Sequence, residues 1–193
     1  MPLAVLLVLA LLAWYLSFSA SRLDRLHHRV EGARGALDAQ LVRRAEAAVE
    51  LAASGCLDPA SGLLVAGAAA EALEAGENGD ARRERTESDL TRALQAALDE
   101  ETVQALRNDP VAASMVDRLA AACHRVRLAR RFHNDAVTDA CRVRRKRVVR
   151  WARLAGYAPL PQTFEMDDDS PAPLVRAVRP PSGRTDGPSG ARP

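Results

Sequence analysis

The stretch LDRLHHRVEGARGALDAQLVRRAEAAVELA, residues 23–52, decides the fold of this chain. Its apolar residues recur at steps of three and four, which is the period of a helix with one buried face. They are Leu23, Leu26, Val30, Ala33, Leu37, Leu41, Ala45, Ala48 and Ala52. We therefore expect one long amphipathic helix over residues 22–54. Gly55 and the pair Asp58-Pro59 then predict a break or a sharp kink, because Gly suits a helix end and Asp-Pro a helix start.

The composition agrees with a helical protein. The chain has 193 residues, about one domain's worth; 48% of them are hydrophobic and only 4% aromatic. Ala, Leu and Val must therefore form the core between closely packed helices, and an all-β sandwich is excluded.

Three further helices follow the first one. We expect them over residues 59–76, from a cap at Thr86 or Ser88 to Arg107, and from Pro110 to about Arg153. The last carries an inward stripe of Met115, Leu119, Ala122, Val126, Ala129, Ala136, Ala140 and Val143. Four helices joined by short turns predict an all-α fold, an up-and-down antiparallel four-helix bundle over residues 21–165. The prolines beyond it predict a disordered tail over residues 166–193.

The N-terminal sequence predicts a membrane anchor. No residue from Leu3 to Phe18 is charged, and a helix of that length spans roughly 24 Å of the roughly 30 Å hydrocarbon core. We expect a transmembrane helix over residues 1–20. Its membrane residues are Leu3, Val5, Leu7, Leu9, Leu12, Trp14, Tyr15 and Phe18. A cleaved signal peptide is the competing interpretation, but the run lacks a basic segment before it and a good cleavage site.

Arginines set the expected orientation. Arg22, Arg25 and Arg29 follow the apolar run, so the positive-inside rule puts the N-terminus outside and the body in the cytoplasm. The cysteines Cys56, Cys123 and Cys141 form no CxxC pair, which agrees with reduced thiols. The expected location is the plasma membrane of a bacterial cell.

Charge is divided unevenly along the body. Residues 56–109 carry net −7 and residues 110–153 net +9. The densest basic tract consists of Arg142, Arg144, Arg145, Lys146, Arg147, Arg150 and Arg153. Three interpretations stay open for it: neutralisation by the acidic helices, contact with anionic lipid, and nucleic-acid binding, which no interleaved aromatic residues support.

Two polar stretches are expected at one height. In an up-and-down bundle the first and last helices bring residues 38–44 and 130–135 to the same distance from the membrane. Their polar residues are Asp38, Gln40, Arg43, Arg44, Arg130, Arg131, Asn134 and Asp135. They predict an interhelical polar network that sets the helix register, or a patch that binds a partner.

Those two stretches also carry a resemblance. Residues 29–31 (RVE), 38–44 (DAQLVRR) and 129–137 (ARRFHNDAV), with the ending from Gly156-Tyr157 to Phe164-Glu165, resemble the LemA family of bacterial membrane-anchored helical proteins. The resemblance covers roughly residues 1–166 and implies the anchor and the helical bundle. The chain departs from the family's pattern at Gly32, Arg34 and His133, and the family is not known as enzymes.

Catalytic chemistry is not expected. His124 and His133 are nine residues apart and point in opposite directions on one helix, so they cannot share a metal. Glycine-rich phosphate loops and GxSxG or HExxH motifs are absent from the sequence. We expect no enzyme, cofactor or metal site, but an interaction or scaffolding module whose partners are membrane lipids and a protein. A homo-oligomer stays open, and the alternative function is a secreted or soluble basic helical domain that binds nucleic acid.

Overall fold

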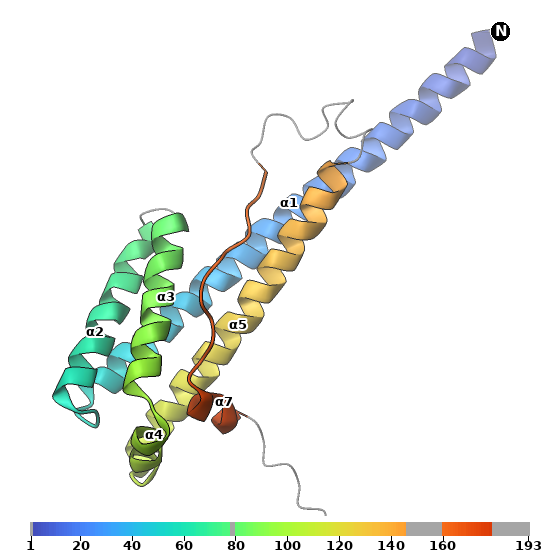
Figure 1. The fold of residues 1–193 in the computed structure, drawn as a ribbon. Helices are drawn as coiled ribbons and strands as arrows, with labels where there is room; N and C mark the ends of the chain where they lie inside the picture. The colour runs from blue at the N-terminus through green and yellow to red at the C-terminus, as the bar shows by residue number, and fades with distance from the viewer. Residues whose placement is uncertain (1, 78–79, 146–159, 179–193) are drawn as a thin grey trace, which may run out of the picture.

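The computed structural model describes residues 2–77, 80–145 and 160–178, and several side chains between residues 4 and 23 lie outside this description. Over the described residues the chain forms helices, turns and one extended segment, and no strand. The expectation of an all-helical protein is therefore confirmed. The molecule consists of a long helix whose first part projects from a helical body (Figure 1).

Helix α1 spans Pro2–Ala53 without interruption. Its inner stripe is buried from Leu37 to Leu51, with Leu41 and Ala48 fully buried between them. Gly32 and Gly35 do not end it, and the helix continues on both sides of each glycine. The sequence period thus predicted the α1 core face correctly.

The chain reverses between α1 and helix α2, Pro59–Glu74. Gly55 adopts a φ of 73°, a left-handed conformation that glycine tolerates without strain. Asp58 caps α2 by accepting hydrogen bonds from the backbone N–H groups of Ala60 and Ser61, both at 3.1 Å. The predicted interruption is therefore a full break, followed by packing of α2 back against α1.

The next expected helix is divided in two. After a short 3₁₀ turn, Ala75–Glu77, helix α3 spans Asp80–Ala97 and helix α4 spans Glu100–Arg107. The prediction of a single helix to Arg107 was wrong, because Asp99 is the N-cap of a second helix. The Asp99 carboxylate accepts a hydrogen bond from Thr102 N at 2.8 Å. This bond from the Thr102 backbone lowers the pKa of Asp99.

The prediction that Thr86 or Ser88 caps this helix was also wrong. Both lie inside α3, and their hydroxyls donate to carbonyl oxygens of the preceding turn rather than capping the helix.

Helix α5 spans Pro110–Arg144 and starts at Asp109, whose side chain accepts from Val111 N. Leu119, Val126 and Ala140 of the predicted stripe are buried. The helix packs along α1, and α4 packs against its beginning. The helix ends at Arg144, with Arg145 as its C-cap, so it is shorter than the expected helix to about Arg153.

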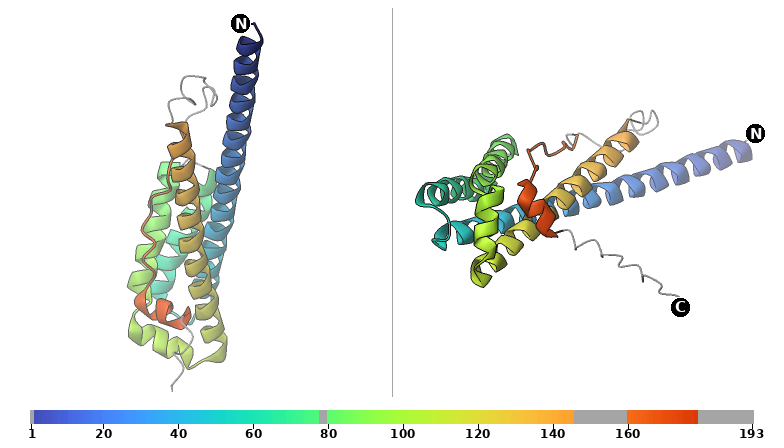
Figure 2. Two further views of the ribbon diagram at one scale, coloured as in Figure 1. Left: turned by 90° about the vertical axis from the view of Figure 1, so that its right-hand side faces the viewer. Right: turned by 60° about the horizontal axis from the view of Figure 1, so that its bottom comes forward.

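Residues 160–171, which we call the strap, form an extended segment that runs along the body between α3 and α5 (Figure 2). Helix α7, Ala172–Val178, follows it and packs on α5 and α4. Residues 166–178 are therefore ordered, contrary to the expected disordered tail, because Met166 and Leu174 are buried against the helices.

Two clusters form the core. The larger joins α1, α2, α3, α4 and α5 with Leu174 of α7, and the smaller joins Leu37, Leu41 and Val126 with Phe164 and Met166 of the strap.

The projecting part of α1 exposes large apolar side chains, among them Leu3, Leu6, Leu7, Leu11, Trp14, Tyr15 and Phe18. The side chains of Val5, Leu9 and Leu12 lie outside the described set. Among the residues whose placement the structure describes, no helix is both long enough and apolar enough to span a bilayer.

Candidate functional site: a buried polar layer and the strap groove

An ion pair lies inside the body between α1 and α3. Arg44 Nη2 and Glu87 Oε2 are 2.5 Å apart, and the two side chains are only 3% and 1% exposed. Arg44 also donates to the Glu87 carbonyl at 2.9 Å and to Thr91 Oγ1 at 3.0 Å. We call these three residues the polar layer. Because a displaced charge would be buried without a partner, the layer holds α1 and α3 in one register.

A second set of ion pairs ties the same helices one level closer to the N-terminus of α1. Asp38 Oδ1 lies 3.3 Å from Arg34 Nε and 3.1 Å from Arg83 Nη1. Arg34 also contacts Asp80 at 2.5 Å, and its guanidinium lies 4.9 Å from the centre of the Phe164 ring. Arg34 therefore links α1 to both α3 and the strap.

Helix α3 binds the strap through one polar row. Its members recur at steps of three and four along α3 and are Glu84, Ser88, Thr91 and Gln95. Glu84 accepts from Glu165 N at 2.8 Å, and Ser88 accepts from Asp167 N at 3.0 Å. Thr91 donates to the Asp167 carbonyl at 2.8 Å, and Gln95 to the Asp169 carbonyl at 2.6 Å. The row thus binds the backbone of three alternate strap residues, Glu165, Asp167 and Asp169.

Helix α5 holds the other side of the strap. Asn134 accepts from Phe164 N at 2.9 Å and donates to the Phe164 carbonyl at 3.2 Å, which fixes this residue by both backbone groups. Arg130 contacts the Asp168 carboxylate through Nε at 2.9 Å and Nη2 at 2.8 Å. Phe164 itself is fully buried. The groove between α3 and α5 therefore forms hydrogen bonds to the extended backbone of the strap and buries alternate side chains of the strap.

The residues of the predicted network lie at one level of the body but find different partners. Asp38 and Arg44 pair with α3, while Arg130 and Asn134 bind the strap. Gln40 bonds α5 directly, because its side-chain oxygen accepts a hydrogen bond from Arg125 Nε at 3.2 Å. Arg43, Arg131 and Asp135 are exposed.

Sequence reasoning missed Glu87, Thr91 and the strap residues. A signal for the first two was present, because both are polar residues inside the stripe that Leu90 and Leu94 continue. Polar residues on an apolar stripe indicate a buried polar contact. The partner of each residue is not encoded locally.

His133 lies on α5 beneath the strap and is 3% exposed. Neither ring nitrogen makes a hydrogen bond of good geometry with a described residue, but the backbone of Gln162 is close enough to interact with the ring. Burial lowers the pKa of His133, and the nearby charge of Arg34 adds to this. The backbone of Gln162 and the carboxylates of Asp38 and Asp80 oppose the shift. His133 is therefore neutral in the folded body at neutral pH.

We expect acid to destabilise the fold through His133. In the unfolded chain His133 takes up a proton at about pH 6.5, whereas in the folded chain it does so only at a lower pH. The contribution of His133 to stability is therefore complete above about pH 6.5 and falls as the pH decreases below that value. The midpoint of urea unfolding should decrease between about pH 7 and pH 5, and His133→Leu should flatten this decrease. His28→Leu, at an exposed histidine, is the control, and an unchanged pH profile in His133→Leu contradicts the assignment.

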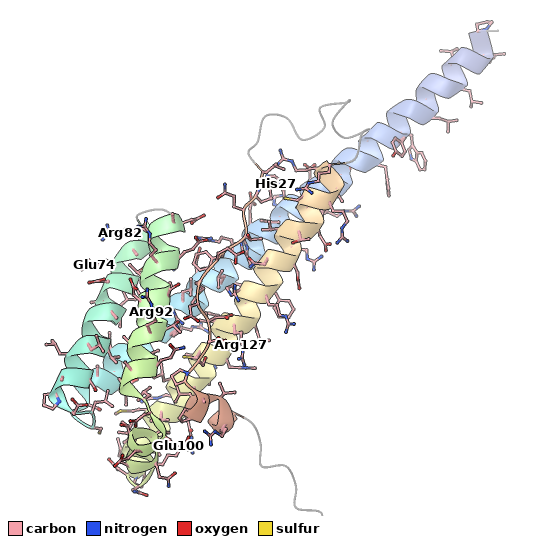
Figure 3. All side chains as sticks on the ribbon, viewed as in Figure 1. His27, Glu74, Arg82, Arg92, Glu100 and Arg127 are labelled. Atoms are coloured by element: carbon pink, nitrogen blue, oxygen red, sulfur yellow. The ribbon has the colours of Figure 1, made fainter. Side chains whose placement is uncertain are left out.

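Basic groups gather where α1 leaves the body. Arg29 lies 3.7 Å from Asp139 of α5, which also contacts Arg142 at 3.6 Å. Figure 3 shows His27 of α1 beside the C-terminal end of α5. Of the predicted basic tract, Arg142, Arg144 and Arg145 are therefore at this end, whereas Lys146, Arg147, Arg150 and Arg153 lie outside the described residues.

Comparison with known proteins adds no relative. No protein-family model matches the sequence, and no curated protein matches it significantly.

Proposed function

We propose that the chain is a LemA-like protein of the bacterial plasma membrane, with its N-terminus outside and its body in the cytoplasm. In this proposal the apolar part of α1 is a transmembrane helix, and the four helices α1, α2, α3 and α5 act as an up-and-down bundle. The body works as a non-catalytic interaction and scaffolding module at the membrane surface.

One observation carries the proposal: the large apolar side chains that the structure describes in the projecting part of α1 are all exposed. Leu3 is 81% exposed and Trp14 is 70% exposed. The run from Leu3 to Phe18 contains no charged residue. An exposed apolar surface of this kind indicates a binding partner. The hydrocarbon core of a bilayer can contact apolar side chains on all sides of a helix.

The basic groups at the same end of the body support the orientation. Arg22, Arg25 and Arg29 directly follow the apolar run, and the end of α5 brings Arg142 and Arg145 to the same level. A bilayer surface at this level would contact both sets. We call these arginines, together with the other cations of the basic tract, the basic collar. Anionic lipid headgroups attract it by about 1 kcal/mol for each cation near the surface.

We expect the chain to stay with membranes through a carbonate wash, and Leu7→Arg with Leu11→Arg to release it. Each arginine at the centre of a membrane helix costs about 2.5–3.5 kcal/mol. Leu63→Arg with Leu64→Arg is the matched control, because these leucines of α2 are also exposed on the surface but lie on the body. Cell fractionation measures the result. A wild-type chain found in the carbonate supernatant would contradict the anchor.

We expect the basic collar to bind anionic vesicles when the anchor is disabled. In the Leu7→Arg, Leu11→Arg chain, changing Arg144, Arg145 and Arg147 to Gln should weaken binding to phosphatidylserine vesicles about 100-fold. Changing Arg82, Arg85 and Arg92 of α3 to Gln alters the charge equally and should have little effect. Co-sedimentation measures binding, and tighter binding to duplex DNA than to vesicles would favour the nucleic-acid alternative instead.

A further inference from the structure

The outward face of α2 is apolar and exposed. Helix α2 packs on α1 and α3 (Figure 1), and its opposite face carries Leu63, which is 77% exposed, and Leu64. No residue from Pro59 to Ala70 is charged. A surface helix normally carries polar residues on its outer face. An outer face that is apolar as well indicates a further contact.

An open groove runs along this face beside α3. It has a volume of about 530 Å³ and is lined by Leu63, Leu64 and Gly67 of α2 and by Ala93 of α3. A Cβ added at Gly67 would meet no described atom of another element within 4 Å. The centre of the groove is therefore open to a side chain or a helix from outside.

The groove has an acidic edge and a basic edge. Glu71 lies on the α2 side, and Arg92 lies on the α3 side, where it pairs with Asp89. Arg92 is 66% exposed in this pair, so its guanidinium remains accessible to a second carboxylate. A helix that fits the groove therefore carries an apolar face followed by an acidic residue. The outer face of α2 meets this description, because Leu63, Gly67 and Glu71 follow one another at steps of four.

The bilayer does not reach this face in the proposed membrane orientation. A Cβ added at Gly62 of α2 would lie 3.5 Å from the carbonyl oxygen of Ala52 in α1, so the two residues are at one level. The stretch of α1 from Phe18 to Ala52 is about 51 Å long at 1.5 Å per residue. Leu63 therefore lies far from the lipid, and a protein surface is the fitting partner for it.

A membrane anchor limits how two copies of the chain can meet. Copies that enter the bilayer with one orientation are related by a two-fold axis only when the axis lies along the membrane normal. Every residue is then at the same height as its counterpart. Two α2 helices can meet in parallel, with Leu63 beside the second copy's Leu63. Glu71 then comes to the level of the second copy's Arg92, because both residues line one groove.

The exposed apolar residues of α5 do not fit the groove at equal height. Helix α5 contacts Gln40 of α1 through Arg125, and Phe132 lies further along α5 toward the membrane end. Leu63 is at the level of Ala52, which is further from the membrane. A second copy therefore presents its own α2 to the groove, and not Phe132.

We propose that the chain forms a parallel two-fold dimer through the outer face of α2, so that a second copy of this chain occupies the groove. Leu63 and Leu64 form its apolar centre, Gly67 lets the two helices approach, and Glu71 of each copy pairs with Arg92 of the other. Tethering to one membrane raises the effective concentration of the copies, which favours a small interface. This inference rests on the proposed anchor and names the partner of the proposed interaction module.

Cysteine cross-linking in intact cells tests the contact. The parent chain carries Cys56→Ser, which removes the exposed native cysteine. After oxidation, we expect Leu63→Cys or Gly67→Cys to give a disulfide-linked band at twice the chain mass. Phe132→Cys is the matched control, because Phe132 is also exposed but lies on α5, and it should give none. Cross-linking at neither α2 position, at Phe132→Cys instead, or only to a protein of another mass would overturn the dimer.

Exchange of charge between copies tests the ion pair. In the Leu63→Cys chain, Glu71→Arg alone and Arg92→Glu alone should each lower the cross-linked fraction about fivefold, because both pairs of the dimer become repulsive. Co-expression of the two variants should restore cross-linking between them, because the mixed dimer has opposite charges in both pairs. An ion pair within one chain cannot be rescued in this way. Failure of the mixed dimer to form would overturn the parallel arrangement.

The double change Leu63→Arg with Leu64→Arg separates this inference from the anchor. It should lower cross-linking through Gly67→Cys at least about tenfold, because the buried area of both leucines is lost. Carbonate fractionation should not change. Undiminished cross-linking in this variant would overturn the dimer and leave the anchor in place. Release of the wild-type chain by carbonate would contradict the anchor, whereas cross-linking in intact cells reports on the dimer by itself.

Discussion

Replacing Glu87 with alanine should lower the free energy of unfolding by about 3–5 kcal/mol. The substitution leaves the Arg44 guanidinium, only 3% exposed, without its carboxylate partner. Thr91 still accepts one hydrogen bond from Arg44, but a hydroxyl does not neutralise the charge. Urea unfolding of the full chain, followed by circular dichroism, measures the loss.

Two controls separate the buried charge from simple loss of contacts. Arg118→Ala breaks an ion pair with Glu50 whose side chains are 55% and 47% exposed, and it should cost less than about 1 kcal/mol. Combining Glu87→Leu with Arg44→Met removes both charges and should cost less than Glu87→Ala alone. If Glu87→Ala is as mild as Arg118→Ala, the polar layer does not hold the helices together.

Replacing Phe164 with alanine should lower the free energy of unfolding by about 3–5 kcal/mol, the usual cost of emptying a core aromatic site. Phe164 is fully buried in the smaller core cluster with Leu37 and Val126. The strap loses its main apolar anchor, so amide hydrogen exchange at residues 165–169 should become fast as well. Urea unfolding and hydrogen exchange measure the two effects.

Phe132 provides the matched control for this prediction. It lies on α5, two residues before Asn134, and is 65% exposed. Phe132→Ala should change stability by less than about 0.5 kcal/mol and leave the strap protected. A Phe164→Ala chain with the stability of wild type would show that the strap does not close the core.

Local patterns were sufficient for the long helices and their faces. The stripe that runs through Leu37 and Leu41 predicted the buried face of α1, and the pair Asp58-Pro59 predicted the start of α2. Both signals act over a few residues, because helical periodicity and capping depend on near neighbours in the chain. The division at Asp99 was missed because the apolar stripe continues through Leu98 into Leu106 across the cap.

The partners of the polar residues needed the tertiary structure. Arg44 and Arg130 were predicted as interhelical contacts, yet their partners Glu87 and Asp168 are 43 and 38 residues away in the chain. Charge alone does not choose among the many acidic groups of the sequence. The packing of the helices decides the pairing, because it brings only some of the acidic groups within reach of each arginine.

By itself, the sequence determined that the chain is helical, where α2 and α5 begin and which faces of the long helices are apolar, since those properties follow from the order of neighbouring residues. Only the tertiary structure decided that residues 160–178 return to the body and that the strap binds between α3 and α5. The strap has no periodic pattern of its own, and its backbone groups are satisfied by side chains up to 81 residues away. The position of such a segment depends on the groove that the helices form, so its own sequence does not predict it.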